Sequence, residues 1–359
     1  MESNIAPHGM VVTPHHLATQ SALAILREGG TAVEAMVSAA ATIAVVYPHM
    51  NSIGGDGFWL IVPPQGDPVV IEACGVADIF NTPPPTQGLV SLAILGVLDK
   101  LGIGGQNEGQ FIHATVEATK QAFQMRDEYI TDPAYMKTDP KSLIASQALF
   151  NMAREVNFDA ISSVGGGKGP GDTIWMGAMD NKGFSVSFIQ SIYHEFGSAV
   201  LLPKTGILWH NRGVAFNLKK DHLLSLKPGK KPYHTLNPAA ARLRDGRVFV
   251  YGTRGGDGQP QTQAGIFHRY VVQGLGLQET VSAPRWIYGR VSGDPDTTLK
   301  MENRFKEETI QYLKERGHDI VMLPEYSEKT GQAGALVRHT NGMLEGAFDL
   351  RSNGSAAGF

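Results

Sequence analysis

The residue pair Asp172 and Thr173 offers the clearest opportunity for chemistry in this sequence. A glycine-rich stretch, Ser162 to Gly171, ends at this pair, and a strand-like run begins with the threonine. If the peptide bond before Thr173 is cut, the new α-amine can act as base for the hydroxyl of the same residue, without a histidine. The alternative is a linker that leads into a β-hairpin, because an Asp-Asn-Lys-Gly turn follows at 180–183. The local pattern leaves both interpretations open.

A second glycine-rich loop contains Gly255 and Gly256, between a predicted strand, Arg247 to Tyr251, and a predicted helix. Backbone N–H groups ahead of a helix N-terminus are well placed to hold a developing oxyanion. A strand-to-helix turn that needs positive φ explains the same residues. Nearby, the imidazole of His234 and the hydroxyl of Thr235 could line a pocket or simply cap one.

The elements that must position these residues are predicted from the spacing of apolar residues and from turn signals. One predicted helix, Ala32 to Val46, is apolar on nearly all sides and is therefore expected in the core. The other expected helices span 17–26, 89–101, 110–129, 262–273 and 306–316, and the expected strands span 10–13, 58–62, 68–73, 173–180, 184–190, 335–338 and 343–347. Strand blocks alternating with helix blocks predict sheets covered by helices.

The composition is that of a globular protein with enough material for a large core. Of the 359 residues, 42% are hydrophobic and 18% are charged. The net charge of -3 and the lack of a basic run argue against nucleic-acid binding. No secretory signal or membrane span is visible in the sequence, which predicts a cytoplasmic protein that does not bind membranes.

Several other kinds of site are disfavoured. Lys168 in the glycine-rich stretch is followed by glycine, and no helix comes next, so a phosphate loop is not predicted. No G-x-S-x-G nucleophile motif occurs. A single cysteine and the adjacent pair His15 and His16 do not make a metal site, and we expect neither a metal nor an organic cofactor.

Taken together, the motifs resemble those of the gamma-glutamyltranspeptidase family of N-terminal-nucleophile hydrolases. The resemblance covers nearly the whole chain, and its landmarks occur in the family's order. They are Leu26 to Val33, Ile53 to Phe58, Pro83 to Gly88, Gly171 to Thr173, Asp180 to Gly183, Phe196 with Gly197, and Gly255 with Gly256. The resemblance implies an α+β fold, the four-layer αββα sandwich in which two stacked sheets are covered by helices.

The resemblance also implies roles for individual residues. Thr173 matches the nucleophile, which cleavage between Asp172 and Thr173 would free. The chain would then be a heterodimer of a large subunit, 1–172, and a small subunit, 173–359, and a higher oligomer is left open. Gly255 and Gly256 match the residues whose amides hold the oxyanion. Ser191 occupies the position of a threonine that orients the α-amine.

The matched substrate pocket departs from that of the transpeptidases. Cys74 replaces the arginine for the glutamyl carboxylate, and Arg212 and Ala215 replace the acidic pair that binds the substrate α-amine. A cation at 212 favours a substrate carboxylate and disfavours an amino group. The other replacements in the pocket are Tyr193, His234 and Thr235, with Ile174 and Trp175 after the nucleophile. The pattern is more similar to the oxamate amidohydrolase branch, whose substrate is a small amide bearing a carboxylate.

The chain is also shorter than the family's large subunits, which carry a long helical region before the triple-proline motif. Here residues 75–81 join the preceding strand to that motif almost directly. The missing region is natural, engineered or merely absent from the numbering. We expect a self-processing amidohydrolase for a small carboxylate-bearing amide. Gamma-glutamyl transfer or glutathione hydrolysis, a cephalosporin-acylase-like activity, and an inactive small-carboxylate binder are the alternatives.

Overall fold

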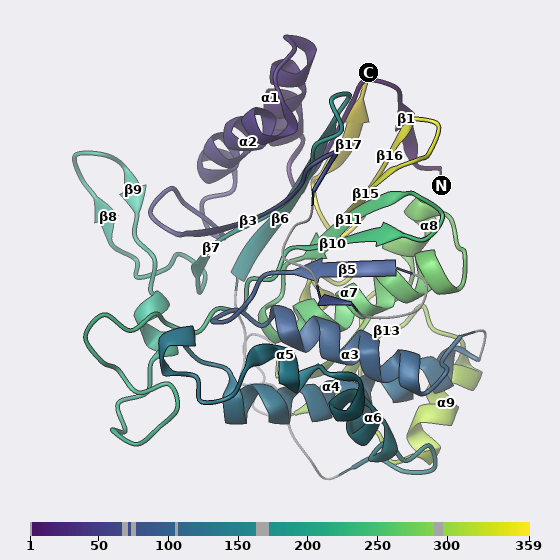
Figure 1. Ribbon diagram of the computed structural model, residues 1–359. Coiled ribbons are helices and arrows are strands. Elements are labelled where there is room, and N and C mark those ends of the chain that lie inside the picture. Colours follow the sequence, from purple (N-terminus) through teal and green to yellow (C-terminus); the bar gives the residue numbers. More distant parts are fainter. Residues whose placement is uncertain (1, 67–70, 73–76, 105–106, 163–171, 291–296) are drawn as a thin grey trace.

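The computed structural model describes residues 2–66, 71–72, 77–104, 107–162, 172–290 and 297–359 (Figure 1). Cys74 and most of the glycine-rich stretch, 163–171, lie outside these ranges. Within them, no helix is both long and apolar enough to cross a bilayer.

In the described residues, two large sheets and two small ones are formed by 17 strands. They are β1 (Asn4–Ala6), β2 (Gly9–Thr13), β3 (Asp56–Val62), β4 (Ile71–Glu72), β5 (Ala77–Asn81), β6 (Asp172–Asp180), β7 (Ser185–Tyr193), β8 (Leu201–Leu202), β9 (Ile207–Leu208), β10 (Ala239–Leu243), β11 (Val248–Thr253), β12 (Trp286–Gly289), β13 (Thr298–Glu302), β14 (Ile320–Leu323), β15 (Ala333–Arg338), β16 (Leu344–Phe348) and β17 (Ser355–Gly358). The larger sheet has seven strands in the order β1-β16-β15-β11-β10-β5-β4, and the other has five in the order β17-β2-β6-β7-β3.

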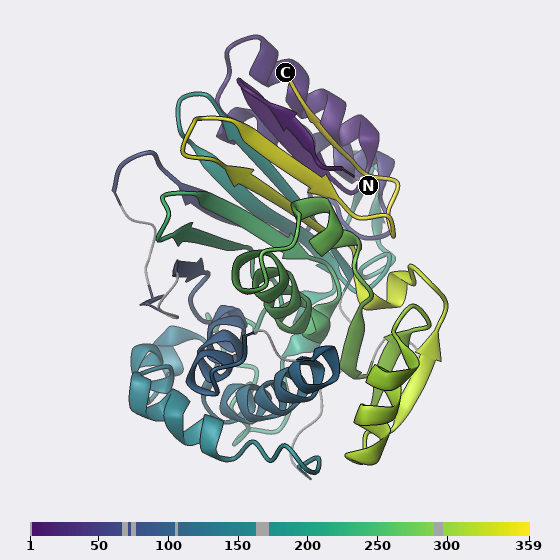
Figure 2. The same cartoon turned by 90° about the vertical axis from the view of Figure 1, so that its right-hand side faces the viewer.

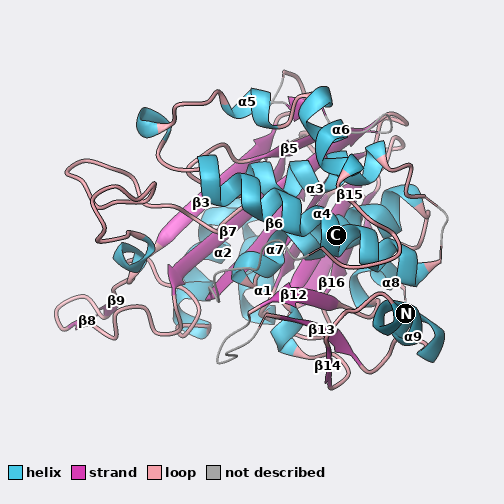
Figure 3. Ribbon diagram, turned by 90° about the horizontal axis from the view of Figure 1, so that it is seen from below, coloured by secondary structure: helices cyan, strands magenta, loops and turns pink. Residues whose placement is uncertain are grey.

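The helices are α1 (His16–Arg27), α2 (Ala32–Val46), α3 (Gly88–Lys100), α4 (Glu108–Tyr129), α5 (Pro140–Leu143), α6 (Ser146–Arg154), α7 (Gln259–Phe267), α8 (Leu277–Ser282) and α9 (Glu307–Glu315). Helices α1 and α2 cover the outer face of the five-stranded sheet, and α3, α4 and α7 lie on the far side of the seven-stranded sheet (Figures 1 and 2). The β8–β9 hairpin projects from one end of the molecule (Figures 1 and 3).

These layers confirm the predicted four-layer αββα sandwich. One apolar cluster lies between α1, α2 and the five-stranded sheet, a second lies between the two sheets, and a third lies between the seven-stranded sheet and its helices. Both large sheets are covered on both faces, as in other layered α+β domains.

The prediction that α2 is a core helix is wrong. Its side chains at Ala35, Met36 and Ala39 are buried against the sheet, whereas Val37 and Val45 on the other face are 56% and 76% exposed. The sequence could not separate these faces, because alanine and valine line both sides of the helix. The helix therefore has one buried and one exposed face, although the residues on both faces are apolar.

Trp175 fixes how the two sheets stack near the start of β6. Its indole is 3% exposed and donates a hydrogen bond from Nε1 to Ser187 Oγ at 2.9 Å. A Cβ atom at Gly252 of β11 would lie 2.2 Å from Trp175 Cδ1, and one at Gly334 of β15 would lie 2.4 Å from Trp175 Cζ3. The seven-stranded sheet therefore needs glycine at both positions to accept the indole.

We predict that Gly252→Ala lowers the free energy of unfolding by about 1–3 kcal/mol, because the added methyl group overlaps the Trp175 indole. Chemical denaturation measures this change. Gly104→Ala is the matched control, since a Cβ there meets no atom within 4 Å. Equal free energies of unfolding for the two variants would show that the sheets can move apart enough here to accept the methyl group without loss of stability.

Candidate functional site

Thr173 is the second residue of β6, and its side chain is fully buried. Its Oγ1 has no hydrogen-bond partner among the described residues. The β6–β7 ladder is irregular at this point, because Asp172 pairs with Tyr193 whereas Ile174 pairs with Gln190. Strand β7 thus carries one extra residue opposite Thr173, a bulge of the kind that re-aims side chains beside active sites.

Ser191 and Tyr193 form the β7 side of this bulge. Ser191 is 1% exposed, and its Oγ accepts a hydrogen bond from the N–H of Tyr193 at 2.8 Å. Tyr193 has a φ of 79°, a conformation that is costly for a residue with a large side chain. The serine hydroxyl therefore helps to hold a strained turn beside Thr173.

Arg212 reaches the same place from the loop after β9. Its side chain is buried, and Nε donates to Asp56 Oδ2 at 2.8 Å. Its guanidinium carbon lies 4.1 Å from the centre of the Tyr193 ring. Both terminal nitrogens, Nη1 and Nη2, lack a partner among the described residues. Arg212 is therefore held by one nitrogen and one ring face, and two donors remain for another group.

Asp56 was not singled out from the sequence, although it lies inside the first glycine loop. It begins β3, which pairs with β7 so that Asp56 is opposite Ser191. Its carboxylate compensates the charge of Arg212, and the Nδ1 atom of His234 lies 3.9 Å from its Oδ2. The pocket thus contains an ion pair, and the predicted cation at Arg212 has a carboxylate beside it.

His234 and Thr235 lie against this ion pair and are also buried. Burial and the nearby Arg212 cation lower the pKa of His234 to about 3, so its imidazole is neutral at neutral pH. Neither His234 Nδ1 nor Thr235 Oγ1 has a partner in the part of the chain that the structure describes. Both side chains can form a hydrogen bond with a ligand.

Gly255 and Gly256 form a tight turn between β11 and α7. Their φ values are 121° and 52°, and both lie in the left-handed region that glycine adopts without strain. Within the described ranges, neither N–H donates to a protein acceptor. Trp175, two residues after Thr173, contacts Gly252 of β11, three residues before Gly255. Thr173 and the glycine turn are therefore both close in sequence to one contact between the two sheets.

Gln87, at the end of the triple-proline segment, joins the two walls of the site. Its Nε2 donates to the carbonyl of Thr235 at 2.7 Å and to the carbonyl of Gly256 at 2.8 Å. Its Oε1 accepts from the hydroxyl of Tyr233 at 3.1 Å, and its own side chain is fully buried. No sequence signal predicts this role, because a glutamine beside a proline run has no characteristic spacing.

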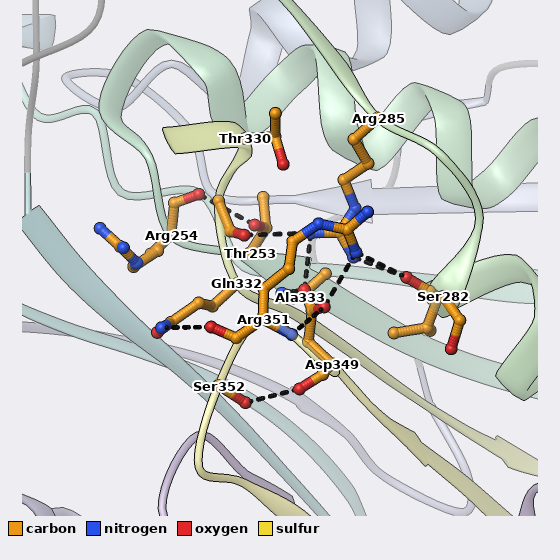
Figure 4. Close-up of polar contacts among 12 residues, drawn as sticks. Thr253, Arg254, Ser282, Arg285, Thr330, Gln332, Ala333, Asp349, Arg351 and Ser352 are labelled. Atoms are coloured by element: carbon orange, nitrogen blue, oxygen red, sulfur yellow. Dashed lines mark hydrogen bonds and ion pairs between the residues drawn. The ribbon is translucent and has the colours of Figure 1, made fainter. Parts of the chain in front are cut away.

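A buried ionic cluster supports the glycine turn from behind (Figure 4). Asp349 is paired with Arg285 at 2.6 Å and with Arg351 at 3.0 Å, and it also accepts the N–H of Ala333. Arg351 forms two further bonds to Glu302, at 2.6 and 2.7 Å. Burial alone would raise the pKa of Asp349, but the two arginines hold it below its usual range.

This cluster is tied to the turn through residues 331 and 332. Gln332 donates from Nε2 to the carbonyl of Arg351 at 3.0 Å, and its own carbonyl accepts the N–H of Arg254 at 3.1 Å. A Cβ atom at Gly331 would lie 2.6 Å from the carbonyl oxygen of Arg254. The backbone that enters the Gly255 turn is therefore packed against a fixed support.

The structure thus connects the residues that the sequence proposed. Thr173, Ser191 and Tyr193 meet at the bulge, Tyr193, Arg212 and His234 meet around Asp56, and Gln87 links Thr235 to Gly256. No group of three or more His, Cys, Asp or Glu side chains in the described ranges could hold a metal ion. The arrangement offers a hydroxyl, a cation, a neutral imidazole and free backbone amides, which together suit acyl transfer without a metal.

Known proteins share both the sequence pattern and the fold. The chain is 42% identical over 525 residues to the oxamate amidohydrolase proenzyme of Klebsiella pneumoniae, with 99% of each chain covered. It is 38% identical to a glutathione hydrolase-like proenzyme of Bacillus subtilis, covering 78% of this chain and 54% of that relative. The crystal structure of a cephalosporin acylase from Bacillus halodurans superposes with a TM-score of 0.89 at 21% identity, covering 100% of this chain and 97% of that one.

A family model described as Gamma-glutamyltranspeptidase matches residues 18–78 and 76–359. The match contains the bulge at Thr173, the ion pair at Arg212 and the Gly255 turn. The chain belongs to the gamma-glutamyltranspeptidase family of N-terminal-nucleophile hydrolases.

Proposed function

We propose that this chain is a self-processing amidohydrolase that cleaves a small, carboxylate-bearing amide similar to oxamate through an acyl-threonine intermediate. The observation that carries the proposal is a set of buried polar atoms, on Thr173 and on residues near the adjoining bulge and ion pair, that have no hydrogen-bond partner among the described residues. They are Thr173 Oγ1, Arg212 Nη1 and Nη2, His234 Nδ1 and Thr235 Oγ1. Buried polar groups without partners are costly, so a cluster of them fits a site that a polar ligand completes.

Processing comes first in the proposed sequence of steps. The Thr173 hydroxyl attacks the carbonyl carbon of Asp172, the peptide C–N bond breaks, and the α-amine of Thr173 takes a proton. Water then hydrolyses the resulting ester, which releases the carboxylate of Asp172 and restores the hydroxyl. The free amine next to the hydroxyl is the base that the later reaction needs.

In the amide reaction, the Thr173 oxygen attacks the substrate carbonyl carbon while its proton moves to the α-amine. The N–H groups of Gly255 and Gly256 bind the oxyanion, and each such donor contributes about 3–4 kcal/mol in other enzymes. The C–N bond then breaks, and the α-ammonium returns its proton to the leaving nitrogen. Water repeats these steps on the acyl-threonine ester and releases the acid. Ser191, beside the nucleophile, orients the α-amine.

Arg212 binds the substrate carboxylate in this proposal. Its two free nitrogens can form a bidentate bond, while Nε remains paired with Asp56. His234 and Thr235 complete the pocket as neutral hydrogen-bonding groups. The name of the Klebsiella pneumoniae relative, an oxamate amidohydrolase, agrees with a substrate that places a carboxylate next to the amide.

The two products of cleavage, 1–172 and 173–359, would stay together as a heterodimer. Strand β6 pairs with β2 from the first segment and with β7 from the second, and β7 pairs with β3. In the other sheet, β5 from the first segment pairs with β10 from the second. Because both sheets contain strands from both segments, separation would require unfolding.

We also propose that this chain lacks a region that is present in its relatives. The alignment with the Klebsiella pneumoniae relative spans 525 residues, which exceeds this 359-residue chain by 166, and the two stretches matched by the family model meet at 76–78. Both observations support the shortening expected near residues 75–81. The described part of the site comes from segments outside this junction.

We predict that the purified chain gives two bands on a denaturing gel and that the smaller band begins Thr-Ile-Trp-Met. Thr173→Ala should give one full-length band, because the attacking hydroxyl is absent, whereas Thr173→Ser should still be cut. N-terminal sequencing of the small band makes the assignment. A wild-type chain that stays intact would support the inactive carboxylate binder instead.

We predict that Arg212→Ala raises KM for oxamate about 10- to 100-fold, because a charge-assisted bond to the substrate carboxylate is lost. Ammonia release measures the activity, and thermal melting checks that the variant is folded. Arg244→Ala is the matched control, since Arg244 forms an exposed ion pair with Asp78. An unchanged KM in Arg212→Ala would show that Arg212 does not bind the substrate carboxylate. Release of 4-nitroaniline from a gamma-glutamyl anilide by the wild-type chain would favour glutamyl chemistry.

We predict that Gln87→Leu lowers kcat about tenfold or more and changes KM less, because the Gly256 carbonyl loses a donor that holds the turn carrying the two oxyanion amides. The measurement is oxamate kinetics on the processed enzyme. Gln147→Leu, on the exposed face of α6, is the matched control. A change in melting temperature with unchanged kcat would limit Gln87 to a structural role.

A further inference from the structure

A cavity of about 430 Å³ adjoins the site and is larger than the proposed reaction on oxamate requires. Its wall includes residues that belong to the site or border it, among them Tyr193, Ala215, Thr235 and Asp257, which follows Gly256. Arg212 is not part of the wall. Cavities that hold drug-sized ligands have volumes of roughly 300–1,000 Å³. Oxamate, with two carbon atoms, would leave most of this space empty.

The rest of the wall is mainly aliphatic and aromatic. It comes from the end of α4 and from the loops on either side of residue 220, and its apolar members include Ile130, Val214, Phe216, Leu223 and Leu224. Val214 is 61% exposed and marks the rim, whereas Ile130 is buried. Such a wall stabilises an apolar group that leaves water.

The charged residues of the wall are already paired with each other. Arg126 bonds to Asp257 at 2.8 Å and to Asp127 at 2.9 Å, and its Nη2 atom has no hydrogen-bond partner among the described residues. The imidazole of His194 also faces the cavity, and burial together with the Arg212 cation lowers its pKa, which keeps it neutral at neutral pH. The cavity therefore suits a neutral occupant.

We propose that the physiological amide carries an apolar substituent of about one aromatic ring on its nitrogen, and that this cavity binds that substituent. The inference rests on the proposed function, in which Arg212 holds the carboxylate of the acyl half. An amide carbonyl has only one other substituent, the nitrogen, so the amine half is the part that extends into the cavity. The leaving group is then an apolar primary amine, released with the proton that the α-ammonium returns.

Two uncleavable ketones test the cavity without turnover. Phenylpyruvate replaces the N–H of N-phenyloxamate by CH₂, and pyruvate replaces the NH₂ of oxamate by CH₃. Calorimetric titration of the full chain should show phenylpyruvate binding at least about tenfold more tightly than pyruvate, because apolar contacts of this size give about 10- to 200-fold discrimination. Equal affinities would overturn the proposal.

The variant Ala215→Trp places an indole at the cavity wall and should reduce the phenylpyruvate-to-pyruvate affinity ratio to about one. Leu218→Trp is the matched control, because Leu218 is 87% exposed and is not part of the wall. Val214→Trp, at the exposed rim, repeats the test if Ala215→Trp melts at a lower temperature. A ratio that the wall variants leave unchanged would show that the ring binds elsewhere.

Hydrolysis separates failure of this proposal from failure of the proposed function. The wild-type chain should release aniline from N-phenyloxamate with a higher kcat/KM than it releases ammonia from oxamate. Cleavage of oxamate with no gain for N-phenyloxamate would overturn the cavity assignment and leave the amidohydrolase intact. Phenylpyruvate binding that depends on Ala215, without hydrolysis of either amide, would support the cavity and refute the amidohydrolase.

Discussion

The pairing of β6 on both of its edges is the constraint on which the site depends. Hydrogen bonds to β2 on one side and to β7 on the other fix the backbone of β6 within the five-stranded sheet. The indole of Trp175 then locks this strand against β11 of the other sheet. Thr173 therefore occupies a fixed position within the sheet. A nucleophile held by a strand is placed more accurately than one held by a loop.

Buried arginines are paired differently in the site and in the ionic cluster that supports the glycine turn. Arg351 satisfies its guanidinium with two carboxylates, Glu302 and Asp349, and the cluster around it keeps the Gly255 turn in place. Arg212 is equally buried, but among the described residues only its Nε is paired with a carboxylate. The same chain thus provides full pairing where rigidity is needed and leaves donors open where a ligand can enter. Incomplete pairing is costly without a ligand, and for that reason it points to function.

The sequence was sufficient for the layers, which follow from the ordered family motifs, and for the position of the glycine turn, which has a local pattern. The nucleophilic role of Thr173 came from the same ordered motifs and stays a proposal. The apolar periodicity located α1, α3 and α4 within a few residues, and the fold followed from the ordered motifs. Asp56 and Gln87 were not found, since their roles come from partners 156 and 148 or more residues away. The exposed face of α2 was missed because its composition matches that of the buried face. Long-range partners and the side of an alanine-rich helix are set by tertiary packing, which no short window records.

The position of the proposed shortening explains why the fold could tolerate it. The two stretches matched by the family model meet at 76–78, just before β5, and β4 and β5 are the last two strands at one edge of the seven-stranded sheet. Strand β5 is still fully paired with β10. The proposed loss lies at a sheet edge, away from the central strands that carry Thr173 and the Gly255 turn. It also lies on the segment that leads to Gln87, so the triple-proline segment must be anchored by its own contacts, and the hydrogen bonds of Gln87 to Thr235 and Gly256 supply that anchor.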